Sequence, residues 1–493
     1  MAVLVPIRAS IKVRWIARLH REYWPLALVL SIFGSALAVA TGYSLVPSFL
    51  SLALISLCAY PAIRYMAEGT TTVPAAAILA AAYAAQFALP VFLGDGTLWI
   101  VGGFKTISEE SLTGALLIAI LGMVAFLAVF YSHIVTTFVD RLPSVELHLN
   151  RTRALMFCLL FGGLVLVMSR VFSTLSADYQ TQLSALFRVL QTQMLVAIGV
   201  LAWLTYSSNS RWLRILYYVF VSAAVIEGLA SGFLEAALIP VGIMFACEWV
   251  YTGRFNKGVA AALLGAALLL NPVKADFREA IWYSAYADPD ASRLDKAVLW
   301  LQSGFKYWTD VIQGARAGED AGFQLVRRTS MIDVVAHVYE TTPALVPYLD
   351  GETYSYFAYS LIPRLLWPEK PVASANRTLA VEYGLTTVEG AERSTFGVSL
   401  IGEGYANFGI AGAIGIMVVL SLILRVIQRL FATEAAGPGG TALFLAFFAF
   451  FLNGLGSSAE ILLGNLLQSM VASSILMYWV SERRRALAPS RRP

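Results

Sequence analysis

The segment "LTGALLIAILGMVAFLAVFYSHIV", residues 112–135, contains no Asp, Glu, Lys or Arg. An α-helix rises about 1.5 Å per residue, so roughly 20 such residues cross a hydrocarbon core of about 30 Å. Comparable apolar stretches recur along most of the chain. This pattern predicts an all-α polytopic membrane protein.

The composition points to the same class. Hydrophobic residues make up 58% of the 493 positions and charged residues 13%, with a mean hydropathy of +0.70. A soluble domain carries about a quarter charged residues. The cysteines Cys58, Cys158 and Cys247 form no CxxC pair, so the sequence indicates neither a redox motif nor a zinc site.

About twelve spanning helices are predicted. The first ends in "ALAVATG", which is compatible with a signal-peptidase site, but the long basic segment before it favours an uncleaved helix. The predicted spans are 24–41, 45–63, 73–93, 112–135, 154–175, 186–206, 213–229, 232–251, 258–273, 404–424, 441–457 and 461–480.

Basic residues divide the connecting segments into two sets. With the N-terminus placed in the cytoplasm, the cytoplasmic segments hold twenty Lys and Arg residues, whereas the short outer loops hold Lys105 and Arg170. The positive-inside rule therefore predicts two cytoplasmic termini and an even number of spans. The expected parts are an N-terminal bundle (1–273), an outer loop domain (274–403), C-terminal helices (404–480) and a basic tail (481–493).

The outer loop begins with a predicted amphipathic helix over residues 291–312. Ser292 and Asp295 give it a capping start. Its aromatic residues suit the membrane interface, so the helix either lies on the membrane or packs on the rest of the loop. The apolar positions at helical spacing are Leu294, Val298, Leu301, Phe305, Trp308 and Ile312.

A second helix is predicted over 321–340. Asp333, His337 and Glu340 share one of its faces. Such a face can perform acid–base chemistry or bind a metal, although a solvated polar stripe is the commoner explanation. The following segment, 342–371, contains five prolines, which prevent one long helix. It is expected to be re-entrant or interfacial and to line a water-filled cavity.

Polar residues gather at the outer ends of the predicted spans and in this loop. Cations there suit a phosphate or diphosphate, aromatic rings suit sugars, and carboxylates are candidate bases. A lipid-linked, diphosphate-activated sugar donor would use all three. The cations are Arg170, Lys274, Arg278, Arg327, Arg328, Arg364 and Lys370; the aromatics include Tyr354, Tyr356, Tyr359 and Trp367; the carboxylates are Glu227, Glu235 and Glu403.

Several familiar motifs are absent from the sequence. It contains no GxxxxGK[ST], no HExxH and no GxSxG, and no GxGxxG follows a predicted strand. These absences argue against ATP-driven transport, nicotinamide chemistry and serine hydrolysis.

Four short stretches resemble a known family. They are "NPVKADFR" (271–278), "TPALVPYLDGETY" (342–354), "IPRLLWPEKP" (362–371) and "GEGYANFGIAGAIG" (402–415). Together they are similar to conserved stretches of bacterial O-antigen polymerases, also called oligosaccharide repeat-unit polymerases. The likeness covers about residues 270–420.

The resemblance implies an inner-membrane glycosyltransferase whose large loop is periplasmic. Such an enzyme transfers a growing glycan from undecaprenyl diphosphate to a lipid-linked repeat unit, without a metal or other cofactor. A flippase and a chain-length regulator are implied partners. By position, the resemblance implies roles for Lys274, Arg278, Arg364, Glu403, Tyr405 and Asn407.

Within this interpretation, Glu403, Arg364, Arg278 and His337 are the candidate catalytic residues, although His337 does not align securely with the histidine of the related O-antigen ligases. Two alternatives remain. A ligase would use the same donor with another acceptor, and a lipid-linked oligosaccharide flippase or other transporter would move the donor. The single dominant loop and the absence of similar halves favour the enzyme.

Overall fold

The computed structural model describes residues 13–40, 42–68, 73–93, 106–175, 177–208, 210–254, 256–283, 292–315, 329–362, 366–367, 369–370, 374–393 and 396–482. These residues form helices, and none of them belongs to a β-sheet. Eleven helical segments are long and apolar enough to cross a membrane. The prediction of an all-α polytopic membrane protein is therefore confirmed.

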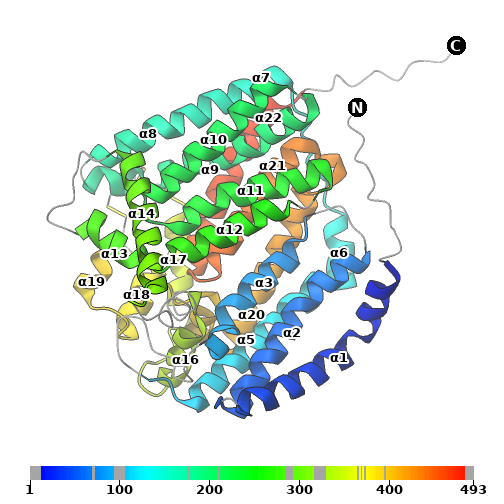
Figure 1. Ribbon diagram of the computed structural model, residues 1–493, viewed down its shortest axis with the longest axis vertical. Coiled ribbons are helices and arrows are strands. Elements are labelled where there is room, and N and C mark those ends of the chain that lie inside the picture. The colour runs from blue at the N-terminus through cyan, green and yellow to red at the C-terminus, as the bar shows by residue number, and fades with distance from the viewer. Residues whose placement is uncertain are drawn as a thin grey trace.

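The first half of the chain is a series of helices that pack on their neighbours. A backbone in lipid must satisfy its polar groups within each segment, which helices do. α1 packs on α2, and α10 packs on both α9 and α11 (Figure 1). The bounds are α1 Val13–Ala40, α2 Leu45–Glu68, α3 Ala75–Phe87, α4 Pro90–Leu93, α5 Glu109–Phe130, α6 His133–Asp140, α7 Arg151–Phe157, α8 Gly163–Thr174, α9 Ala177–Ser208, α10 Arg211–Ala230 and α11 Leu234–Thr252.

The ninth predicted span, 258–273, is shorter in the structure than expected. It forms α12, Lys257–Leu270, whose 14 residues rise about 21 Å. Asn271 and Pro272 end this helix because proline lacks the N–H that a continuing helix needs. The chain then enters the short helix α13, Lys274–Arg278.

The outer loop contains the helix that was predicted over 291–312. It is α14, Arg293–Ile312, and Ser292 and Asp295 form a full capping box at its start. The helix predicted over 321–340 is described only from residue 329 and contains α16, Ile332–Thr341. The remaining loop helices are α17 Glu352–Ser360, α18 Ala375–Glu382 and α19 Val388–Arg393.

The C-terminal part consists of α20, Leu400–Phe431, α21, Gly437–Gly454, and α22, Ala459–Val480. Phe408 and Gly409 interrupt α20 with non-helical dihedral angles, and Gly409 has a φ of 60°, which glycine adopts without strain. A Cβ on Gly412 would lie 2.0 Å from the oxygen of Gly404, so the chain folds sharply between these glycines. The predicted span 404–424 is therefore two helices, and its first part turns away from the long second part.

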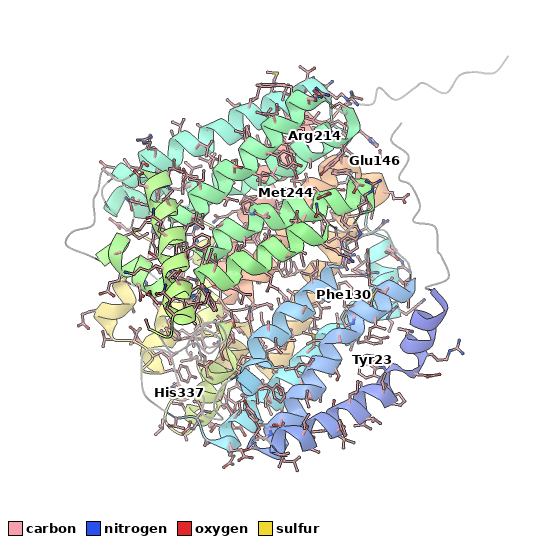
Figure 2. The ribbon with its side chains drawn as sticks, in the orientation of Figure 1. Tyr23, Phe130, Glu146, Arg214, Met244 and His337 are labelled. Atoms are coloured by element: carbon pink, nitrogen blue, oxygen red, sulfur yellow. The ribbon has the colours of Figure 1, made fainter. Side chains whose placement is uncertain are left out.

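The segments predicted to be cytoplasmic meet at one end of the bundle. Leu149 forms a β-bridge with Ser481, and the N–H of Leu147 donates to the oxygen of Ala436. Glu146 and Arg214 also lie toward this end, whereas His337 lies toward the opposite one (Figure 2). We call these the Ser481 end and the loop end. The pairing of segments agrees with the predicted alternation of loops.

Two hydrophobic clusters hold the helices together. The larger one runs through α3, α5, α9, α20 and α21, where Phe444, Phe447 and Phe451 are fully buried. The smaller one joins α10, α11, α12 and α14 around Trp300, whose ring stacks on Phe277 at 4.7 Å between centroids. In Figure 1, α14 runs across the loop-end termini of neighbouring spans instead of beside them. This arrangement places the start of α14 against α8 and α10.

Candidate functional site

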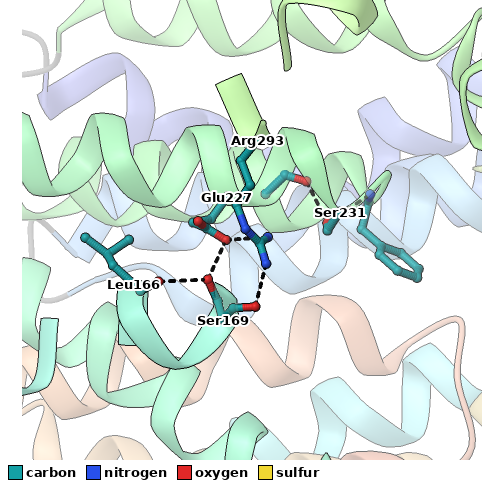
Figure 3. A network of polar contacts seen from close by, with 7 residues as sticks. Leu166, Ser169, Glu227, Ser231 and Arg293 are labelled. Carbon is teal, nitrogen blue, oxygen red and sulfur yellow. Dashed lines mark hydrogen bonds and ion pairs between the residues drawn. The ribbon is translucent and has the colours of Figure 1, made fainter. Parts of the chain in front are cut away.

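Arg293, at the first position of α14, forms an ion pair with Glu227 near the end of α10. Its Nη1 lies 2.6 Å from Glu227 Oε2, and its Nη2 donates to the backbone oxygen of Ser169 at 2.6 Å. The Ser169 hydroxyl donates to the same carboxylate oxygen at 2.9 Å (Figure 3). This network joins α8, α10 and α14, and it commits Glu227 to a structural ion pair.

Lys274 and Arg278, which the sequence singled out, reach the turn between α10 and α11. They are one helical turn apart on α13, so they share a face. Lys274 Nζ lies 3.7 Å from Glu235 Oε2. Arg278 Nε donates to the oxygen of Gly232 at 2.8 Å, and its guanidinium carbon lies 4.7 Å from the Phe233 ring centroid.

Arg170 completes this group from α8. It follows Ser169, its side chain is exposed, and its charge acts on the Glu227 carboxylate. We define the basic cluster as Arg170, Lys274, Arg278 and Arg293, together with the carboxylates Glu227 and Glu235. Among these six residues the cations outnumber the carboxylates by two. An exposed arginine beside paired cations can bind a phosphate or diphosphate with charge-assisted hydrogen bonds.

Glu403 and Asn407 belong to a second, buried network. Glu403 Oε1 accepts from the Thr353 hydroxyl at 2.8 Å, and Oε2 accepts from the Ala459 N–H at 2.6 Å. Asn407 Nδ2 donates to Thr353 Oγ1 at 2.8 Å, and its Oδ1 accepts from the Gly351 N–H at 3.0 Å. These contacts fasten α17 to α20 and α22.

This network changes the interpretation of Glu403. Its side chain has 0% exposure and both carboxylate oxygens have protein donors. A general base must reach the proton of an incoming hydroxyl. The buried position therefore favours a positioning role for Glu403 over the predicted role as a base.

The aromatic residues are divided between the network and the loop surface. Tyr354 stacks on Phe408 at 6.1 Å between centroids, and burial together with the nearby Glu403 charge raises the pKa of its hydroxyl. Tyr405 is 6% exposed and contacts other tyrosines, so it packs instead of presenting a face to a sugar. Trp367 lies edge-on to Tyr359, and Lys370 Nζ donates to the oxygen of Ile362 at 3.1 Å.

His337 lies in the interior of the loop domain. Its Nε2 is 2.8 Å from the oxygen of Tyr383, and burial raises the pKa of the Tyr383 hydroxyl. Asp333 is buried and accepts from Ser330 at 2.8 Å, whereas Glu340 is exposed. The predicted carboxylate–histidine–carboxylate face is thus split between interior and solvent. The described residues contain no group of three or more His, Cys, Asp or Glu side chains that could hold a metal.

Three predicted site residues lie outside the described residues, namely Arg327, Arg328 and Arg364.

The structure also adds residues that were not predicted from the sequence. The ion-pair network around Glu227 includes Arg293 and Ser169, and the buried network around Glu403 includes Thr353. The contacts of these residues link segments that are distant in the sequence. Arg188 on α9 is exposed, and its Nη1 donates to Asn465 Oδ1 at 3.2 Å. An arginine inside an apolar helix is itself a signal, because such residues are rare in spans.

Comparison with known proteins gives one family match. The model of a family described as a domain of unknown function, DUF8712, matches residues 104–487. The chain belongs to the DUF8712 family. No curated protein and no solved structure matches the chain. The resemblance to O-antigen polymerases therefore stays a prediction.

The DUF8712 match defines which part of the fold the family shares. It begins just before α5 and ends just after α22, so α1 to α4 lie outside it. The basic cluster and the Glu403 network both lie inside it. Both therefore belong to the DUF8712 domain.

Proposed function

We propose that the protein is a polysaccharide polymerase of the bacterial inner membrane. It would transfer a growing glycan from undecaprenyl diphosphate to a lipid-linked oligosaccharide repeat unit, on the periplasmic side where the loop end would lie. The observation that carries this proposal is the basic cluster, in which α8, α13 and α14 bring four cations together at one end of a spanning bundle. A flippase and a chain-length regulator would be its partners.

The basic cluster would act on the leaving group. As the glycosidic bond to the diphosphate breaks, negative charge grows on the diphosphate oxygens. Positioned cations stabilise that charge more strongly in the transition state than in the ground state. Arg170 is exposed and would make the first contact, while contacts with Glu235 and Gly232 hold Lys274 and Arg278 in place.

Glu235 is the best placed of the three candidate bases. Its side chain is 49% exposed, compared with 23% for Glu227, and Glu403 is fully buried. It lies at the first turn of α11, beside Lys274. We propose that Glu235 deprotonates the acceptor hydroxyl and that Lys274, 3.7 Å from its Oε2, orients the carboxylate.

The test is reconstitution in proteoliposomes with purified undecaprenyl-diphosphate oligosaccharide. We expect a ladder of longer glycans from the wild-type protein. Arg278→Ala should reduce its rate about 10- to 100-fold, the effect of losing one charge-assisted contact. Glu235→Gln should reduce it by about 10²-fold or more, as removal of a general base does. Arg211→Ala, at the opposite end of α10, is the matched control and should retain the wild-type rate.

The same assay separates the alternatives. Transbilayer movement of the lipid-linked donor without any ladder would contradict the polymerase and support a transporter. Transfer to a non-repeat acceptor, again without a ladder, would support a ligase. If Arg278→Ala and Glu235→Gln leave the ladder unchanged, the basic cluster is not responsible for the activity.

A further inference from the structure

The turn between α21 and α22 is bordered by buried side-chain oxygens that have no hydrogen-bond partner. Gln86 Oε1, near the end of α3, lies 3.8 Å from the position that a Cβ on Gly456 would take. Asn376 on α18 reaches the next residue of the turn, because its Nδ2 donates to Ser457 Oγ at 3.3 Å. Ser458 follows directly. Within the described part of the chain, Gln86 Oε1, Asn376 Oδ1 and Ser458 Oγ find no partner, although Asn376 is only 3% exposed and Ser458 1%.

A buried carboxylate borders the same turn. Glu403 is fully buried, and its Oε2 accepts from the N–H of Ala459, the residue after Ser458. Among the described residues Glu403 forms no ion pair, and the neighbouring carboxylate of Glu460 adds a second negative charge that acts on it. Burying a carboxylate without a cation is strongly unfavourable. Residues 456–459 span at most about 11 Å, so one small region contains this charge and three oxygens without donors.

A metal cation fits these groups better than a water molecule does. Water can donate to the lone oxygens, but it leaves the charge of Glu403 unneutralised. Amide, hydroxyl and carboxylate oxygens are hard ligands, which suit alkali and alkaline-earth cations. A single carboxylate balances one positive charge, and the other three oxygens are neutral, so the set matches a monovalent cation. In membrane transporters, oxygens at breaks between helices hold sodium ions in a comparable way.

We propose that the turn between α21 and α22 binds a monovalent alkali cation, sodium or potassium. The cation would join α3, α18 and α20 to the start of α22, so its role would be structural. This inference does not depend on the proposed enzymatic function, and it is compatible with a transfer reaction that needs no metal. The proposed ligands are Gln86 Oε1, Asn376 Oδ1, Ser458 Oγ and the carboxylate of Glu403.

The test is thermal unfolding of the full-length protein in a neutral detergent at constant ionic strength. Sodium chloride or potassium chloride is expected to raise the Tm until the effect saturates. N-methyl-D-glucamine chloride is not, because its cation is too large for the protein oxygens to surround. A ligand that binds only the folded state stabilises it by mass action, so the Tm at increasing salt gives the apparent Kd.

Two variants connect the effect with the turn. Glu403→Gln keeps the shape of the side chain but removes its charge, and it should raise the apparent Kd at least about tenfold, the effect of losing a contact with a charged group. Ser458→Ala removes an oxygen that makes no hydrogen bond with the described residues, so it should not lower the Tm without the cation. It should nevertheless raise the apparent Kd about two- to tenfold.

Two matched controls make the same changes elsewhere. Glu235→Gln removes an exposed carboxylate and Ser355→Ala an exposed hydroxyl, and both variants should keep the wild-type apparent Kd. Equal stabilisation by N-methyl-D-glucamine chloride would show a general salt effect and overturn the proposal. A wild-type apparent Kd in Ser458→Ala would also overturn it, whether or not Glu403→Gln folds, and so would the absence of any rise in Tm, the result expected if Glu403 is protonated or if water alone binds at the turn.

Discussion

The ion pair between Glu227 and Arg293 shows how one contact can position a whole helix. Glu227 belongs to a spanning helix and Arg293 begins α14, and both side chains are mostly buried. Removing one partner leaves the other charge partly desolvated, which costs more than the net value of the pair. The pair therefore fixes where α14 starts on the bundle.

We predict that Arg293→Gln and Glu227→Gln each lower the Tm in detergent, and that the double variant recovers part of the loss. The recovery is expected because residues in one salt-bridge network couple by about 0.5–3 kcal/mol. Thermal unfolding followed by tryptophan fluorescence measures it. Additive losses in the double variant would show that the two side chains do not interact.

Thr353 is predicted to be as important for stability as the more conspicuous Glu403. Its hydroxyl donates to Glu403 and accepts from Asn407, and it is fully buried. Thr353→Val preserves the shape but leaves two buried polar groups without this partner, at a cost of about 1–3 kcal/mol each. The expected result is a clearly lower Tm. Thr137→Val, at an exposed position of α6, should change it little, and equal Tm values for the two variants would contradict the assignment.

The helix α14 has two different faces. Ala297, Trp300, Gly304 and Tyr307 are buried against the bundle, and the indole N–H groups of Trp300 and Trp308 donate to oxygens at the end of α12. Several apolar side chains predicted from the sequence stay exposed, namely Leu294, Val298, Phe305 and Ile312. One face of α14 therefore packs on the spanning bundle instead of on the rest of the loop, and contact of the other face with the membrane stays a prediction.

We predict that the exposed apolar face of α14 contacts lipid. Spin labels at Leu294→Cys, Phe305→Cys and Ile312→Cys should be more accessible to oxygen than to a water-soluble nickel reagent in proteoliposomes. Labels at Gln302→Cys and Lys306→Cys, on the polar side, should show the reverse. Preferential accessibility to nickel at all five positions would mean that α14 lies in water.

The sequence predicted the capping box and the length of α14 because both depend on neighbouring residues. It did not identify the buried face, because that face combines two aromatic residues with Ala297 and Gly304, which carry little apolar signal of their own. Gly304 lets α14 approach α12 closely, since a Cβ there would lie 2.8 Å from the oxygen of Leu269. Such a fit depends on the partner helix and cannot be predicted from local periodicity.

For the orientation of the whole protein in the membrane, we predict that the loop end faces the periplasm. Cysteines at Gln302→Cys and Glu369→Cys should react with impermeant maleimides added to intact spheroplasts, whereas Glu434→Cys should react only after lysis. The three native cysteines are buried, so background labelling should be low. Labelling of Glu434→Cys in intact spheroplasts would reverse the topology.

The spans were predictable because apolar length is set by the bilayer and needs no knowledge of packing. The site was less predictable. Arg170, Glu227, Glu235, Lys274 and Arg278 do converge, as their common position at helix ends indicated. Their pairing was not predictable, and neither was the burial of Glu403 and His337, because these depend on how the loop helices dock.

The shortness of α12 has a consequence for the surrounding bilayer. A 14-residue helix is several ångströms shorter than the hydrocarbon thickness that the neighbouring spans require. Lipids beside it must compress or tilt to cover the mismatch, so the membrane is expected to thin locally. The thinned patch adjoins α13, which carries Lys274 and Arg278. A polar headgroup that enters from the membrane would therefore cross less hydrocarbon to reach these side chains than it would elsewhere around the protein.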